Sequence, residues 1–150
     1  MTTQQSIPTP GIHKVMIPVR WSDFDRYGHM MNANYIEIAQ EARLLFAATE
    51  FPRYNVAIPA FFVRNLNVDF MQPIMPDVAN QVLVETQVVE IGRTSITTRQ
   101  EIKNHLGEIA CVVECVQVAV DMRSARPREI TTEEKKVLAQ APEKNAGTEK

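Results

Sequence analysis

Apolar and polar residues repeat with two different periods along this chain, and the change of period predicts its elements. Between Asn34 and Thr49 apolar residues recur every three or four positions, which is the spacing of one face of an α-helix. The residues of this stripe are Tyr35, Ile38, Ala39, Ala42, Leu45, Phe46 and Thr49. We expect a helix long enough to cross a whole sheet, ended by Pro52 and the residues after it.

The remaining apolar segments follow the period of two that is typical of half-buried strands. Between Gln81 and Ile91, for example, one face of the expected strand carries residues 82, 84, 86 and 88, which are three valines and a threonine. The other face carries Leu83, Glu85, Gln87 and Val89. Gly92-Arg93 and the stretch from Asn104 to Gly107 carry turn residues. The pattern predicts strands over residues 13–21, 61–70, 81–91, 94–103 and 108–121.

One long helix after a first strand, followed by four further strands, is an α+β order of elements. An antiparallel β-sheet wrapped around one long central helix satisfies it. We expect this domain to span residues 12–130, preceded by a flexible arm over 1–11 that holds two prolines and a glycine. Residues 131–150 should form a short helix, begun by a capping box at Thr131-Thr132-Glu133-Glu134, and a disordered tail after Pro142.

Composition narrows the possible partners. With 23% charged residues and a net charge of −2, the chain has no overall basic field for nucleic acid or an anionic membrane. An anionic ligand therefore needs a local cluster of Arg or Lys. No apolar run reaches the ~18 residues of a membrane span. The polar N-terminal sequence lacks the order of a signal peptide, so we expect a cytoplasmic protein.

The only two cysteines, Cys111 and Cys115, lie four residues apart within one predicted strand. That spacing separates them by roughly 13 Å along the strand, too far for an unstrained disulfide. We expect two buried, reduced thiols. No pair of His or Cys residues completes a metal site at ligand spacing, and we expect no cofactor.

Two carboxylates stand directly before the predicted helix. We expect only one of these two carboxylates, Asp23 or Asp25, to face a site at the helix start. Gly28 allows the tight turn that brings the loop back. A carboxylate beside free N–H groups at a helix N-terminus can hydrolyse an ester or thioester. The alternative is that both aspartates only turn the loop or cap the helix, a role open also to Asn32 or Asn34.

Residues 13–122, most densely 19–43, resemble the 4-hydroxybenzoyl-CoA thioesterase family of hotdog-fold acyl-CoA thioesterases. Asp25, Gly28, Asn34 and Tyr35 match the catalytic Asp, loop Gly, Asn and Tyr of that family. The resemblance implies that Asp25 attacks the thioester carbonyl or activates water to do so. The backbone N–H at Asn32 would then hold the carbonyl oxygen. It also implies a homodimer or a dimer of dimers, with sites between subunits, and an acyl-CoA substrate.

Other positions match a wider set of hotdog thioesterases. Gly28-His29 resembles the start of a Gly-His-x-Asn-Asn element, although Met31 replaces its first Asn, so His29 is expected to line the site. Glu41-Ala42-Arg43 matches a Glu-Ala-Arg element of the helix, and we interpret Glu41 as a structural or water-orienting group. Some hotdog branches use a helix Glu as the catalytic carboxylate. Our candidates for binding the coenzyme A phosphates are Arg93, Arg123 and Arg126.

Four other functions compete with an acyl-CoA thioesterase. A thioesterase acting on acyl-carrier protein would use the same carboxylate. A non-catalytic module that binds acyl-CoA or acyl-carrier protein would keep the pocket without needing an ionised Asp25. A hotdog hydratase would need an Asp–His pair on another loop, for which only His29 is available. A purely structural interaction domain gives no reason for the loop between Asp23 and His29.

Overall fold

The computed structural model describes residues 11–140. Almost all of the expected N-terminal arm, and the expected tail after Pro142, lie outside this range. The elements, in chain order, are β1 (His13–Pro18), the one-turn 3-10 helix η1 (Trp21–Asp23), α1 (Asn32–Arg53), β2 (Phe61–Phe70), β3 (Gln81–Ile91), β4 (Ser95–Lys103), β5 (Ile109–Asp121), β6 (Arg126–Pro127) and α2 (Thr132–Gln140).

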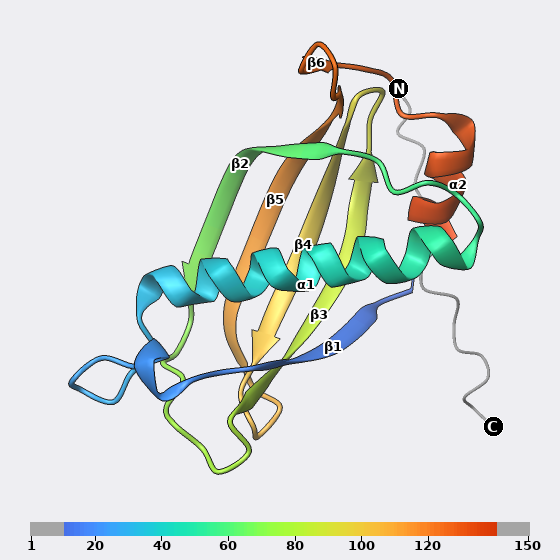
Figure 1. The fold of residues 1–150 in the computed structure, drawn as a ribbon. Helices are drawn as coiled ribbons and strands as arrows, with labels where there is room; N and C mark the ends of the chain where they lie inside the picture. Colours follow the sequence, from blue (N-terminus) through green and yellow to red (C-terminus); the bar gives the residue numbers. More distant parts are fainter. Residues whose placement is uncertain (1–10, 141–150) are drawn as a thin grey trace, which may run out of the picture.

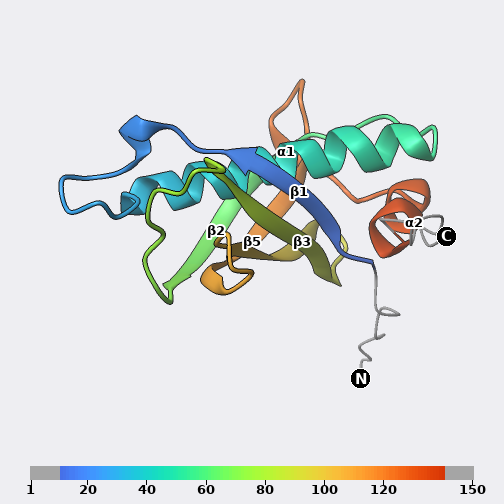
Figure 2. The same ribbon diagram turned by 90° about the horizontal axis from the view of Figure 1, so that it is seen from below.

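The strands form an antiparallel sheet in the order β1-β3-β4-β5-β2, with the short β6 paired to β5. The long helix α1 crosses one face of this sheet (Figure 1). Seen from below, the sheet curls so that β1 rises beside the helix (Figure 2). The predicted α+β hotdog architecture is confirmed.

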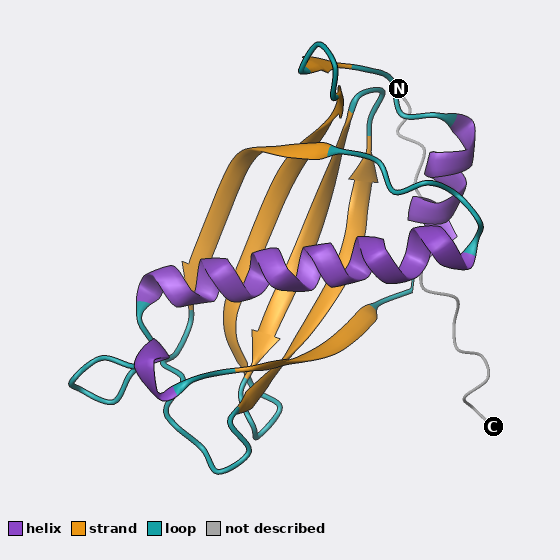
Figure 3. Cartoon of the chain, viewed as in Figure 1, coloured by secondary structure: helices purple, strands orange, loops and turns teal. Residues whose placement is uncertain are grey.

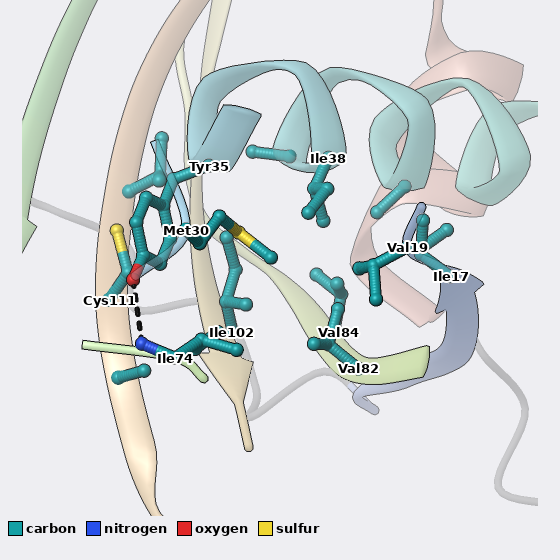
Figure 4. Packing of buried hydrophobic residues seen from close by; sticks show 14 residues of the cluster. Ile17, Val19, Met30, Tyr35, Ile38, Ile74, Val82, Val84, Ile102 and Cys111 are labelled. Carbon is teal, nitrogen blue, oxygen red and sulfur yellow. Dashed lines mark hydrogen bonds between the residues drawn. The ribbon is translucent and has the colours of Figure 1, made fainter. Parts of the chain in front are cut away.

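The face of α1 that meets the sheet is the apolar stripe read from the sequence. Tyr35, Ile38, Ala39, Ala42 and Phe46 are all buried. Ala39 and Ala42 are completely buried, and their small side chains let the helix backbone approach the strands closely. Figure 4 shows the core beneath the first half of the helix, which β1, β3, β4 and β5 all contribute to. A second cluster lies under the second half of α1 and under α2.

The ends of two elements differ from the prediction. The first strand stops at Pro18, because the chain turns through η1 between Trp21 and Asp23. The helix begins at Asn32 and continues through Pro52, which lies in its last turn, to Arg53. A proline there removes only one hydrogen bond close to the helix end, which the fold tolerates.

The expectation that Asn32 or Asn34 caps the helix is wrong. The residue before α1 is Met31, in extended conformation and without a capping side chain. The amide of Asn34 instead donates to Oδ1 of Asp23 at 3.0 Å, and to Glu37 at 3.3 Å. Tertiary contact with the loop has replaced local capping.

The C-terminal helix α2 is fastened in the way its sequence predicts. The Glu134 N–H donates to Thr131 Oγ1 at 3.1 Å, and the Thr131 N–H donates to Glu134 Oε1 at 2.9 Å, which confirms the capping box. Arg128 donates to both carboxylate oxygens of Glu134, each at 2.9 Å. Val137 and Leu138 then pack into the second core cluster.

Both cysteines are reduced and buried, as expected. Burial raises the pKa of Cys111 to about 11, so this thiol is protonated at neutral pH. Within residues 11–140 there is no helix with the length and apolar character needed to cross a membrane.

Candidate active site

The segment from Asp23 to Met30, here called the Asp loop, is a closed turn that projects beyond the start of α1 (Figure 3). The Asp25 N–H donates to the His29 carbonyl at 2.8 Å, and the Gly28 N–H donates to the Asp25 carbonyl at 3.0 Å. Phe24 and Met30 face each other as an antiparallel bridge at its base. Gly28 has a φ of +78°, a conformation that costs other residues energy. Backbone geometry therefore holds the loop in one shape.

Asp23 is the aspartate that anchors this loop. It is buried, with 4% of its surface exposed. Oδ2 accepts from the Arg20 N–H at 2.7 Å, while Oδ1 accepts from the Arg20 guanidinium at 2.8 Å and from Asn34 at 3.0 Å. Its carbonyl oxygen accepts from the Met31 N–H at 3.0 Å. Asp23 thus joins the end of β1, the loop and the first turn of α1.

Asp25 is the aspartate that faces a cleft. Its Oδ1 accepts from the backbone N–H groups of Tyr27 at 2.9 Å and His29 at 3.0 Å. Both bonds fall on one oxygen, so Oδ2 is the oxygen that a ligand can approach. The hydrogen bond from His29, with that from Tyr27, lowers the pKa of Asp25 below its ordinary value, although partial desolvation opposes the shift. Asp25 is ionised at neutral pH.

The Asp25 cleft has a volume of about 410 Å³ and lies between the Asp loop, the start of α1 and the end of β2. Its lining residues are Asp25, His29, Met30, Asn32, Tyr35, Phe70, Met71, Gln72 and Pro73. The last four follow from the path of β2 and were not among the residues predicted from the sequence. Only the prolines of the segment from Gln72 to Pro76, which mark the end of a strand, pointed to them. Asp25 also lines a hollow of about 550 Å³ on the other side of the loop, together with Gly28.

The backbone N–H groups at the start of α1 are not equivalent. The Met30 N–H donates to the Ile74 carbonyl at 2.9 Å, and the Met31 N–H donates to Asp23. The next N–H group, at Asn32, begins the helix and has no intrahelical acceptor. Since Asn32 lines the same cleft as Asp25, the geometry is compatible with polarising a carbonyl beside a carboxylate.

Tyr35 forms part of the wall of the cleft. Its hydroxyl accepts a hydrogen bond from the Ile74 N–H at 3.0 Å, drawn in Figure 4, and its ring packs edge-on against Phe70 at 5.4 Å. Burial raises the pKa of Tyr35, which keeps the phenol protonated. Tyr35 therefore positions the chain that follows β2, where Gln72 and Pro73 line the cleft.

The structure does not bring every candidate residue to this cleft. Glu41 is exposed on α1 and is not among the cleft residues. Arg93 pairs with Glu129 at 2.6 Å. Arg123 lies in the exposed turn after β5, and Arg126 begins β6, which lies at the end of the sheet away from the Asp loop (Figure 1). Within one chain these arginines do not approach Asp25, and their role stays a prediction.

A family model described as the Thioesterase-like superfamily matches residues 19–141. The chain belongs to this superfamily. Membership identifies a thioester hydrolase, in agreement with a carboxylate that lies beside a helix N-terminus. The matched region takes in the Asp loop, the whole sheet from β2 onward and α2.

Solved structures of thioesterases share the fold. A predicted thioesterase from Bacillus stearothermophilus superposes with a TM-score of 0.74 at 22% identity, covering 85% of this chain and 94% of that one. A Thermus thermophilus thioesterase complexed with coenzyme A and Zn has a TM-score of 0.70 at 24% identity, covering 83% and 90%. A 1,4-dihydroxy-2-naphthoyl-CoA thioesterase from Synechocystis has a TM-score of 0.72 at 11% identity, covering 87% and 98%. No curated protein sequence matches this chain significantly.

Metal ligands do not cluster at the cleft. Among residues 11–140, no three side chains of His, Cys, Asp and Glu converge in the way a metal site requires. The chemistry that can be assigned to the cleft belongs to its carboxylate and its backbone N–H groups.

We expect Asp23 and Asp25 to differ in how much each contributes to the stability of this thioesterase. Replacing Asp23 with Ala removes a buried acceptor and leaves Asn34 and the Arg20 N–H without their partner, so we expect a loss of about 1–3 kcal/mol in the free energy of unfolding. Asp25→Ala is the matched control and should change the unfolding free energy much less, because that carboxylate is partly exposed. Urea denaturation of both variants measures the difference. Equal losses would contradict the anchoring role of Asp23.

Proposed function

We propose that this thioesterase hydrolyses an acyl-CoA thioester to a carboxylic acid and free coenzyme A, with Asp25 as its catalytic carboxylate. The observation that carries the proposal is the position of Asp25, ionised and held by two backbone N–H groups, in the cleft that also contains the N-terminus of α1. Coenzyme A as the thiol is supported by the Thermus thermophilus thioesterase, which shares the fold and was solved with coenzyme A.

Two chemical routes lead from this arrangement to the same products. In the first, Asp25 Oδ2 attacks the thioester carbon, the C–S bond breaks, the coenzyme A thiolate leaves, and water then hydrolyses the mixed anhydride. In the second, Asp25 takes a proton from a water molecule that attacks directly. In both, the Asn32 N–H would hold the oxyanion. Entry of ¹⁸O into Asp25 during a single turnover in H₂¹⁸O would identify the covalent route with water attacking the aspartyl carbon of the anhydride, because the direct route and attack of water on the acyl carbon both put ¹⁸O into the acid.

The walls of the cleft favour an apolar acyl group next to the thioester. Met30, Phe70 and Met71 contribute apolar surface, and the Tyr35 ring lies between them and the helix. A substrate with an aliphatic or aromatic group at this point would replace water on these side chains. His29, also at the cleft, is proposed to line the substrate site rather than to act as the base.

We further propose that the active form is a homodimer, alone or as a dimer of dimers, joined along β2. This strand is an edge of the sheet, paired only with β5 within the described residues. It exposes Phe62, Val63, Leu66 and Phe70, and Leu44 of α1 is exposed beside it. A second copy paired here would cover this apolar surface and close the open side of the Asp25 cleft. Arg93, Arg123 and Arg126, which do not line the cleft within one chain, are proposed to reach a bound coenzyme A from the second copy.

The first expected result concerns turnover. Asp25→Asn should lower thiol release from acyl-CoA by ~100-fold or more, because an amide neither attacks nor accepts a proton. Asp121→Asn is the matched control, since Asp121 also accepts a backbone N–H two residues ahead, at 2.8 Å, but lies far from the cleft. A panel of acyl-CoAs and acyl-carrier thioesters would be assayed by thiol detection. Unchanged release in Asp25→Asn would contradict the assignment and make Glu41 the next residue to replace.

The second concerns pH. The lowered pKa of Asp25 means that the carboxylate stays ionised below the ordinary carboxyl range, so activity should be lost only as pH falls through that lowered pKa. We therefore expect kcat/KM to stay level from neutral to mildly acidic pH, over the range in which circular dichroism shows a folded protein. A decline near neutral pH, together with loss of activity in His29→Gln, would assign the base to His29 instead.

The third concerns assembly. Leu66→Lys places a charge in the middle of β2 and should convert the dimer to monomer with loss of activity, although Asp25 is unchanged. Leu106→Lys is the control, because Leu106 is also an exposed leucine, at 68% against 36% for Leu66, but lies in the turn between β4 and β5. Sedimentation velocity measures both. A native protein that sediments as a monomer while fully active would contradict the proposed interface.

A further inference from the structure

Arg43 is a buried cation whose direct partner is neutral. Only 7% of the residue is exposed, and its Nη1 donates to Gln100 Oε1 at 2.9 Å. Gln100 in turn donates to the Ala39 carbonyl at 2.9 Å and to Thr86 Oγ1 at 3.1 Å. This network fixes the guanidinium group between α1 and the sheet, but it supplies no negative charge.

Burying a guanidinium group without a counter-charge is unfavourable. Within residues 11–140 no carboxylate lies within ion-pair distance of Arg43, whereas Arg128, which is more exposed, has the carboxylate of Glu134 beside it. Desolvation lowers the pKa of Arg43, although the nearby Cys115 acts in the opposite direction. A guanidinium group has five N–H donors in a planar fork, and the bond to Gln100 uses one of them. The site is therefore arranged for an anion that the described chain does not provide.

Arg43 opens onto a hollow of about 520 Å³, here called the Arg43 hollow, between α1 and the beginning of β2. Seven of its lining residues are apolar: Leu44, Ala47, Ile58, Pro59, Phe61, Phe62 and Val63. The others, besides Arg43, are the neutral Gln40 and Gln117. A mostly apolar hollow with one buried cation fits an apolar chain that ends in an anionic group.

The Arg43 hollow and the Asp25 cleft border the same two elements. The cleft lies at the start of α1 and the end of β2, and the hollow lies at the second half of α1 and the start of β2. Asn32 and Arg43 are eleven residues apart on the helix, which is roughly 16 Å along its axis. A long acyl chain with its thioester at Asn32 could span this distance along the helix, enclosed between α1 and the second copy that we propose to pair along β2.

We propose that Arg43 binds a carboxylate at the far end of the acyl group, so that the preferred substrates are coenzyme A monothioesters of long-chain dicarboxylic acids. This inference rests on the proposed acyl-CoA thioesterase function. A planar guanidinium group can bind a carboxylate through two parallel hydrogen bonds, and such a pair is strongest where water is excluded. The carboxylate would supply the charge that Arg43 lacks.

The test compares two substrates of equal chain length, one ending in a carboxylate and one in a methyl group, both as coenzyme A thioesters. The native protein should favour the dicarboxylic substrate by about tenfold or more in kcat/KM, the ratio expected for one charge-assisted bond. In Arg43→Met this ratio should fall to about one or below. Arg99→Met is the control, because Arg99 pairs with Glu101 outside the hollow, and it should keep the native ratio.

Binding of the free acids gives a second measurement that needs neither turnover nor a folded variant. Calorimetry on the native protein should show tighter binding of the long dicarboxylate than of the monocarboxylate of equal length. Equal rates on both thioesters would overturn the role of Arg43 while the thioesterase function stands. Absence of turnover, together with selective binding of the dicarboxylate, would overturn the proposed acyl-CoA thioesterase function while the role of Arg43 stands. Loss of the dimer in Arg43→Met with an unchanged substrate ratio would also overturn the inference, because it would assign Arg43 to the subunit interface.

Discussion

The buried carboxylate of Asp23 is the interaction on which the site depends. It collects hydrogen bonds from Arg20 at the end of β1 and from Asn34 in the first turn of α1, while its own carbonyl takes the Met31 N–H. These contacts determine where the helix begins and how the Asp loop leaves it. Asp25, two residues further, can face the cleft because Asp23 makes the contacts that hold the loop to β1 and α1. Two aspartates of the same loop thus have different roles, which follow from their different hydrogen-bond partners.

The elements that were predictable from the sequence are those with many repeats of a simple period. The stripe along α1 and the alternation in β3 and β4 survive folding because each of these elements buries one face against the core. The capping box at Thr131 was predictable because it involves only neighbours in the chain. The choice of Asp25 over Asp23 followed from the family resemblance, and the structure places Asp25, not Asp23, in the cleft.

Features that depend on distant pairs were not predictable. No local pattern shows that Asn34 abandons a cap to bind Asp23, or that Arg43 meets Gln100, which lies 57 residues further along the chain. The two-residue strand β6 exists because Val120 and Asp121 lie opposite it. The walls of the Asp25 cleft likewise come from the end of β2, whose position depends on its pairing with β5. In each case a tertiary contact determines a conformation or partner that the local sequence pattern does not specify.

The bond from Gln100 to the Ala39 carbonyl has a mechanical consequence. It ties the backbone of α1 to β4 roughly a third of the way along the helix, where the small side chains of Ala39 and Ala42 bring helix and sheet together. The bond from Arg43 to Gln100 fixes the same side chain one turn further along, and the bond between Tyr35 and Ile74 holds the first turns of the helix. The helix and the sheet are thus joined as one body, so the Asn32 N–H that faces Asp25 is positioned by contacts made deep in the core.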